Sequence, residues 1–188
     1  MILTTARLVL REVEDTDWQA ILAYQSDPRY RHYDALPHHL RHDVQRLVRE
    51  FVHWQHAKPR HKFQLAITLR THQDLIGTCG IRQATAHTQE AELGYELHPD
   101  HWGQGYATEA ARAILTFGFG TLHLQRIWAQ CVAENEASVR VLERIGMGHE
   151  RHRIKHTWVH NRGRDILRYA MSQAEWRAQI ETVCHPPA

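Results

Sequence analysis

The sequence predicts a three-layer α/β domain in which helices flank a central mixed, mostly antiparallel sheet of about seven strands. Three observations lead to this prediction. Segments that alternate apolar and polar residues, as strands do, occur along the whole chain. Segments with apolar residues at helical spacing lie among them without strict alternation. The 188 residues, 43% of them hydrophobic, are enough for one sizeable core.

The first half of the chain predicts three strands and two helices. In order, we expect a strand at residues 7–13, a helix at 15–25, a loop at 26–39, a helix at 40–56, and strands at 63–70 and 75–82. The helix at 15–25 opens with an acidic cap, and the helix at 40–56 has an apolar stripe. The residues THQD between the two later strands predict a turn.

The second half predicts four strands and three helices. We expect a strand at 91–98 that ends before Pro99, a helix from the following glycine turn to about Phe119, and a strand at 125–132. Asn135 would cap the next helix, and Gly146 would end it in the left-handed conformation. Strands at 151–160 and 164–172 would flank the hairpin turn HNRGR, before a short helix from Gln173. Residues 1–176 are expected to form a single domain, and 177–188 a C-terminal tail.

Composition excludes several classes of protein. The net charge of +2 is too small to indicate nucleic-acid binding. The three cysteines are far apart and form no CxxC pair, which favours a reducing compartment. The N-terminal MILTTARLVLRE lacks the basic and apolar regions of a signal peptide, and no apolar run is long enough to span a membrane. We therefore expect a cytoplasmic protein without membrane or nucleic-acid partners.

The 17 histidines raise the question of a metal site. Three of them, His152, His156 and His160, would share one face of a strand. The chain has no HExxH, and no carboxylate or cysteine completes a ligand set. We expect surface histidines and no bound metal.

The stretch WGQGYATEA, from Trp102 to Ala110, places two glycines at the start of a predicted helix. Unpaired N–H groups and the positive end of the helix dipole make such a start suitable for an anion, often a phosphate. A tight turn without a ligand explains the glycines equally well. A Walker A loop is excluded because the lysine is missing, and a dinucleotide fingerprint is disfavoured because position 108 is Thr.

The residues from Glu92 to Met147 resemble the GNAT superfamily of acetyl-CoA-dependent N-acetyltransferases. The family turn (Arg/Gln)-x-x-Gly-x-(Gly/Ala) corresponds to residues 102–107, with Trp102 in place of Arg or Gln. NEASVRVLERIGM, residues 135–147, matches a second motif. TARLVLRE and RGRDILRYAMSQAEW are similar to the branch of ribosomal-protein N-terminal acetyltransferases. The likeness spans most of the chain and is weakest between residues 26 and 62.

The resemblance implies acetyl-CoA as co-substrate, bound without a metal. The backbone amides of the turn and helix start would bind its pyrophosphate, at Gly103, Gln104, Gly105, Tyr106, Ala107 and Thr108. The strand at 92–98 would splay from the strand at 125–132, so that the pantetheine arm pairs with the backbone near Leu97 and His98. Asn135 would hydrogen-bond the pantetheine amide, or simply cap its helix.

The resemblance also suggests catalytic groups. Glu92 matches the strand position of a catalytic glutamate in several members and would accept the amine proton; an exposed strand carboxylate is the alternative, and His98 is a further candidate. Leu142 stands where many members have a tyrosine. Ser138, one helical turn earlier, would therefore donate to the leaving thiolate, or only bond within its own helical turn.

The acceptor site is expected opposite the cofactor, framed by residues 26–39 and the turn near Asn161, with Tyr30, Tyr33 and Trp54 as lining residues or as core aromatics. The expected reaction is direct attack of a primary amine on acetyl-CoA in a ternary complex, the amine being a protein or peptide N-terminal α-amine. A small amine, such as a polyamine, amino acid or antibiotic, is one alternative, and a non-catalytic acyl-CoA sensor is another. A homodimer is compatible with this branch.

Overall fold

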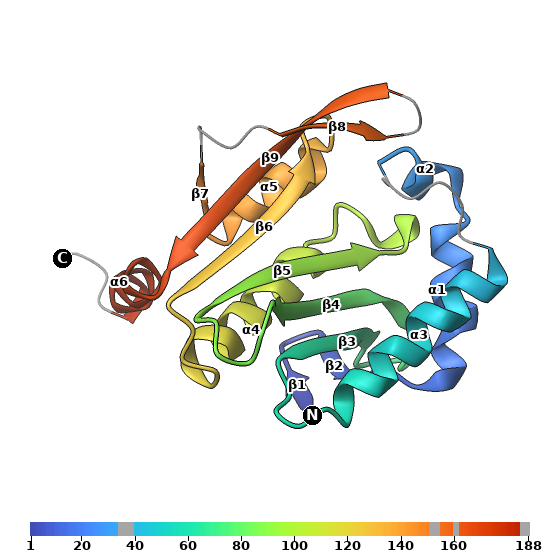
Figure 1. The fold of residues 1–188 in the computed structure, drawn as a ribbon, viewed down its shortest axis with the longest axis horizontal. Coiled ribbons are helices and arrows are strands. Elements are labelled where there is room, and N and C mark those ends of the chain that lie inside the picture. Colours follow the sequence, from blue (N-terminus) through green and yellow to red (C-terminus); the bar gives the residue numbers. More distant parts are fainter. Residues whose placement is uncertain (34–39, 151–154, 160–161, 185–188) are drawn as a thin grey trace.

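The computed structural model describes residues 1–33, 40–150, 155–159 and 162–184. Within these residues a single nine-stranded sheet runs in the order β1-β2-β3-β4-β5-β6-β9-β7, with β8 paired to β9 (Figure 1). The strands are β1 (Ile2–Thr4), β2 (Leu8–Glu12), β3 (Lys62–Leu69), β4 (Leu75–Gln83), β5 (Glu90–Leu97), β6 (Arg126–Val132), β7 (Gly148–His149), β8 (Lys155–Val159) and β9 (Arg162–Ser172). The pair β5–β6 is parallel, and the other pairs are antiparallel.

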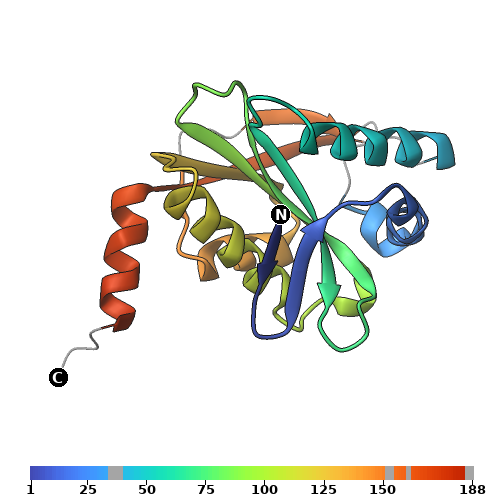
Figure 2. The same ribbon diagram turned by 90° about the horizontal axis from the view of Figure 1, so that it is seen from below.

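Helices cover both faces of the sheet, which confirms the predicted three-layer α/β class (Figure 2). They are α1 (Trp18–Gln25), α2 (Pro28–Arg31), α3 (Arg41–Gln55), α4 (Tyr106–Gly120), α5 (Glu136–Arg144) and α6 (Gln173–Cys184), with short 3-10 turns at Asp15–Asp17 and Pro99–His101. The larger hydrophobic cluster lies between α4, α5 and the sheet. A second cluster joins α1 and α3 to the opposite face. Strand β3 is buried from Phe63 to Thr68, because both of its faces are covered.

Three short elements differ from the sequence prediction. Strand β1 pairs with β2 in an N-terminal hairpin, and β7 adds two residues beside β9. Both strands are too short for alternation to reveal them. Helix α2 lies inside the predicted loop, where Asp27 accepts a hydrogen bond from the Arg29 N–H and Pro28 occupies the first helical turn. The predicted strand at 151–160 is described only over β8, and residues 151–154 and 160–161 lie outside the described residues.

The last two helices, α5 and α6, can be compared with the ends predicted for them. Gly146 follows α5 with a φ of +86°, which confirms the left-handed cap expected there. The Met147 N–H donates to the Leu142 carbonyl at 3.0 Å and closes this end. Helix α6 continues to Cys184, past residue 176, and the Trp176 ring packs on Phe119 with centroids 5.4 Å apart. Within the described residues, no helix has both the length and the apolar character needed to cross a bilayer.

Candidate functional site

The site begins where the central strands separate. The register joins β5 to β6 at three positions only, from Glu90 opposite Arg126 to Glu92 opposite Trp128. Beyond these pairs, β5 stays on β4 as far as Leu97, whereas β6 follows β9 as far as Val132. The facing edges of the two strands therefore diverge, as Figure 1 shows between the labels β5 and β6. The splay expected for these strands is present.

This divergence opens into a cleft of about 590 Å³, which we call the strand cleft. Five parts of the fold supply its walls: the end of β5, the glycine turn with the start of α4, the end of β6, helix α5, and the segment around α2. The lining residues used below are Tyr30, Tyr33, Tyr95, Glu96, Leu97, Trp102, Gly103, Gly105, Tyr106, Ala107, Thr108, Cys131, Asn135, Ser138, Arg140 and Arg144. The cleft thus brings together segments that are far apart in the sequence.

The glycine turn has a backbone that other residues rarely adopt. Gly103 and Gly105 have φ values of +74° and +81°, and Gly105 is the N-cap of α4. No atom lies within 4 Å of the place where a Gly103 Cβ would stand. The first N–H groups of α4 have no partners within the helix because of their position at its start. Since the turn and the helix start both line the strand cleft, this cradle fits a pyrophosphate.

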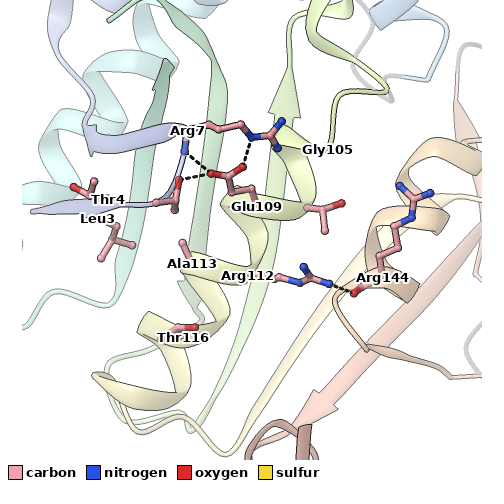
Figure 3. A pocket seen from close by; sticks show the side chains of 11 residues that line it. Leu3, Thr4, Arg7, Gly105, Glu109, Arg112, Ala113, Thr116 and Arg144 are labelled. Carbon is pink, nitrogen blue, oxygen red and sulfur yellow. Dashed lines mark hydrogen bonds and ion pairs between the residues drawn. The ribbon is translucent and has the colours of Figure 1, made fainter. Parts of the chain in front are cut away.

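A residue from the N-terminal hairpin holds this turn in place (Figure 3). The Arg7 side chain donates to the Gln104 carbonyl at 2.9 Å. It also donates to Glu109 Oε2 at 2.7 Å, and the Arg7 N–H donates to Glu109 Oε1 at 2.8 Å, as Figure 3 shows. Its guanidinium also lies 4.5 Å from the centroid of the Tyr106 ring. These contacts attach the turn and the first helical turn of α4 to the start of β2.

Trp102, which stands in place of the usual Arg or Gln of this turn, has a structural role. Its indole N–H donates to the Leu97 carbonyl at 2.9 Å and fixes the turn against the end of β5. The next amide, that of His98, donates toward β4, to the Ile76 carbonyl at 2.7 Å. Because consecutive amides of a strand point to opposite edges, the Leu97 N–H points toward the diverging edge. A backbone donor is therefore available in the gap where a thioester oxygen would need one.

Helix α5 places two predicted residues on the opposite wall. The Asn135 side chain accepts a hydrogen bond from the Ser138 N–H at 3.1 Å and so caps the helix. The Tyr95 hydroxyl, from β5, donates to the Ser138 carbonyl at 3.1 Å and bridges the cleft. Leu142 is 1% exposed and belongs to the core cluster. The position of the usual family tyrosine is thus occupied by a buried aliphatic side chain.

Charges are distributed unevenly along the strand cleft. Arg140 and Arg144 of α5 line the cleft, and Arg144 also lines a neighbouring pocket together with Gly105 and Thr108. Arg140 pairs with Glu136 at 3.0 Å. Glu96 is the single acidic side chain among the described residues of the cleft lining. Burial raises the pKa of the Cys131 thiol to about 11. Burial also raises the pKa of the Tyr95 hydroxyl, so that this group is a neutral hydrogen-bond donor at physiological pH.

Most of the predicted site residues meet in this cleft. Those that line it are Tyr30, Tyr33, Leu97, Gly103, Gly105, Tyr106, Ala107, Thr108, Asn135 and Ser138. Gln104 and His98 have structural contacts instead: the Gln104 amide donates to the Asp100 carbonyl at 3.0 Å, and His98 Nδ1 accepts from the Asp100 N–H at 3.2 Å.

Two other predicted residues lie elsewhere. Trp54 packs on Phe51 in the second core cluster, with ring centroids 5.2 Å apart, and is not part of the cleft lining. Glu92 sits on β5 before the strands diverge, where its Oε2 lies 3.8 Å from an Arg82 nitrogen. The β5 carboxylate that reaches the cleft is Glu96, four residues later.

Sequence reasoning missed Arg7, Tyr95 and Glu96. Glu92 and Glu96 share a strand face, but which of them lies beyond the divergence depends on the register of β5 with β6. The contact between Arg7 and Glu109 joins residues 102 positions apart and has no local signal.

Among the described side chains, no three histidine, cysteine or acidic residues gather as metal ligands; the side chains of His152, His156 and His160 are outside that set.

Comparison with known proteins identifies the family of the chain. Residues 7–148 match a family model described as acetyltransferase (GNAT) domain. The chain is 36% identical over 177 residues to the uncharacterized N-acetyltransferase YnaD of Bacillus subtilis. The aligned residues cover 94% of this chain and 99% of YnaD. It is 29% identical over 105 residues to the putative ribosomal N-acetyltransferase YdaF of the same organism, covering 56% of this chain and 57% of YdaF.

Two solved structures share the fold. A GNAT-family acetyltransferase from Bacillus anthracis superposes with a TM-score of 0.78 at 28% identity, over 93% of this chain and 99% of that one. The spermidine N-acetyltransferase from Vibrio cholerae, solved with CoA and spermine, gives 0.77 at 20% identity, over 92% and 99% of the two chains.

We expect Gly105→Val to weaken CoA binding by at least about tenfold, because a β-branched residue is strongly disfavoured at a φ of +81°. The added Cβ would also stand 3.4 Å from an Arg7 nitrogen. Calorimetric titration with CoA measures the affinity. Gly120→Ala, at the other end of the same helix, is the control and should bind normally. Normal affinity in Gly105→Val would contradict the assignment of the turn as the pyrophosphate cradle.

A second prediction concerns the acid stability of the Arg7–Glu109 pair. Partial burial raises the pKa of Glu109, but hydrogen bonds from Thr5 and Arg7 outweigh burial and hold the pKa below its ordinary value. A carboxylate with a lowered pKa stabilises the fold above its unfolded pKa, near 4.3, and this stability is lost as the pH falls through the folded value. Glu109→Gln should therefore lower the free energy of unfolding by roughly 1 kcal/mol at pH 7.

Urea denaturation of both proteins between pH 7 and pH 3 tests this linkage. The difference between Glu109→Gln and the wild type should shrink below about pH 4. Glu136→Gln, which removes an exposed carboxylate from α5, serves as the control. A difference that stays constant over this range would show that the Glu109 charge does not contribute.

Proposed function

Because this chain belongs to the acetyltransferase (GNAT) family and is an acetyl-CoA-dependent N-acetyltransferase, we propose that the amine it acetylates is the α-amine of a protein or peptide N-terminus. The proposal covers the acceptor and the residues that act on it.

The observation that carries the proposal is the charge pattern of the strand cleft. Arg140, Arg144 and the glycine turn suit the phosphates of CoA at one side. Tyr30, Tyr33 and Glu96 line the same cleft, with Glu96 as the single described carboxylate. One carboxylate suits an acceptor with one positive charge, such as an N-terminal ammonium, whereas a polyamine has several. The likeness to the putative ribosomal N-acetyltransferase YdaF supports the same acceptor.

The thiols of Cys131 and Cys79 favour direct transfer over an acyl-cysteine intermediate. Cys131 lines the strand cleft, but burial raises its pKa to about 11, so the nucleophilic thiolate is scarce at neutral pH. Burial likewise raises the pKa of Cys79 to about 12. In the proposed reaction the neutral amine attacks the thioester carbonyl and the C–S bond breaks. The nitrogen releases one proton to water as the amide forms, and the CoA thiolate takes up a proton.

The strand cleft contains groups suited to each step of this reaction. The Leu97 N–H would stabilise the oxyanion, and the Asn135 side chain would hold the pantetheine amide. The Ser138 hydroxyl would protonate the thiolate, beside the Tyr95 hydroxyl. An N-terminal α-amine has an ordinary pKa of about 7.7–8.0, so an acceptor that binds as the ammonium can release its proton to water near pH 8 and become the neutral nucleophile without a strong base. Glu92 lies outside the cleft lining, and the proposed reaction assigns it no step.

Two alternative functions have supporting observations. The structural likeness to the spermidine N-acetyltransferase from Vibrio cholerae favours acetylation of a small amine. The buried Leu142 in place of the usual tyrosine favours a non-catalytic acyl-CoA sensor.

An acceptor screen separates the three functions: thiol release from acetyl-CoA is followed with Ala- and Ser-initiated peptides, spermidine, amino acids and aminoglycosides. Turnover confined to peptides supports the proposal. Turnover confined to small amines replaces it, and no turnover despite CoA binding favours the sensor.

We expect Ser138→Ala to lower kcat by on the order of 100-fold while leaving the KM for acetyl-CoA nearly unchanged, because the lost contact forms mainly in the transition state. The helix cap survives, since Asn135 bonds the Ser138 backbone N–H. Steady-state kinetics with the best amine of the screen provides the measurement. Thr116→Ala, which removes an exposed hydroxyl from α4, is the control. An unchanged kcat in Ser138→Ala would assign the proton to another donor.

A further inference from the structure

Glu96 occupies a distinctive position in the strand cleft. It lies on the part of β5 that has left β6, one residue before Leu97. Strand alternation separates its side chain from those of Tyr95 and Leu97, which pack toward α4 and the larger core cluster. Glu96 instead points to the face that carries α1, and it still lines the strand cleft.

Two buried neutral donors hold one oxygen of this carboxylate. The Tyr24 hydroxyl and the Gln25 side-chain amide each donate to Glu96 Oε2, both at 3.0 Å. Tyr24 is 0% exposed and Gln25 is 1% exposed, so these donors have little freedom to turn toward water. Burial, together with the negative charge of Glu96, raises the pKa of Tyr24 well above its ordinary value and keeps the phenol protonated. Both bonds hold the Glu96 carboxylate in one orientation.

The carboxylate has no cationic partner within the described residues. Among the described residues, its hydrogen bonds come from those two neutral donors on Oε2, and Oε1 receives none. The neighbouring Arg82 instead pairs with Glu92, with 3.8 Å between a guanidinium nitrogen and Oε2. It also donates to the side-chain oxygen of Gln64 at 3.5 Å. An oriented, partly buried anion without a counter-ion is costly unless a cation joins it.

We infer that Glu96 binds the ammonium group of the acceptor, with Tyr24 and Gln25 as positioning residues that fix the carboxylate from behind. The inference rests on the proposed function for the presence of an amine acceptor, and it adds that the amine is recognised in its charged form. Tyr30 lines the same cleft, and its ring packs edge-on against Tyr24 with centroids 5.5 Å apart. The aromatic walls therefore place apolar surface beside the charge, as an amino-terminal residue requires.

The chain offers a matched control for this role. Glu92 lies on the same strand face as Glu96 and carries the same charge. It has a cationic partner and lies outside the cleft lining. Removing either charge changes the overall electrostatics equally, whereas only Glu96 would contact the acceptor.

The test measures binding rather than turnover. An alanine-initiated tetrapeptide amide, its N-acetylated form, and spermidine are each titrated into protein saturated with CoA. Glu96→Gln should weaken binding of the free-amine peptide about 10- to 100-fold, the usual strength of a charge-assisted hydrogen bond. Glu92→Gln should bind as the wild type does, and the N-acetylated peptide should not distinguish Glu96→Gln from the wild type. Tyr24→Phe retains the charge and should weaken binding only a few-fold.

Further measurements separate recognition from a structural role. Glu96→Gln should keep the wild-type affinity for CoA and a cooperative thermal transition, and the acceptor KM should rise with little change in kcat. Equal effects of Glu92→Gln and Glu96→Gln, or a lower kcat at an unchanged acceptor KM, would overturn the inference. Spermidine binding that depends on Glu96, without peptide binding, would replace the proposed acceptor and retain the ammonium site. If the wild type binds none of the amines, both proposals fail.

Discussion

The separation of β5 from β6 after three paired positions is the constraint on which the site depends. Parallel strands that lie side by side use their backbone groups on each other. Once they diverge, the facing N–H and C=O groups need other partners, because unpaired backbone groups are costly when buried. Trp102 supplies one such partner for the Leu97 carbonyl. The amides of a pantetheine arm have the chemistry to supply others, since they carry the same donors and acceptors as a peptide.

Strand alternation then assigns different tasks to neighbouring residues of β5. Tyr95 and Leu97 face α4 and α5, which carry the residues proposed to bind CoA. Glu96 faces the α1 side, together with Tyr24 and Gln25. Two substrates can therefore approach one short strand segment from different directions and meet at its exposed edge. A one-residue shift of β5 would exchange these faces, which makes the seven-position register between β4 and β5 important for function as well as for packing.

The sequence predicted the fold class, the longer elements and most of the residues around the glycine turn that line the strand cleft. The glycine turn, the Asn135 cap and Gly146 are local features whose residue types carry their own physical reasons. The acceptor side was less predictable. Trp54 has the composition of a pocket residue, but the packing of α3 on the sheet places it in the second core cluster. The choice between Glu92 and Glu96 depends on where two strands separate, and periodicity within one strand cannot give that position.

The contact between Arg7 and the glycine turn has a consequence for how the molecule opens. Trp102 and Gln104 restrain the turn locally, and Arg7, in the hairpin of β1 and β2, holds it from the other end of the sequence. Fraying of this terminal hairpin would loosen the turn without unfolding the rest of the sheet. The two events are thermodynamically linked, so a ligand in the cradle should slow hydrogen exchange in β2, a strand that the ligand does not touch.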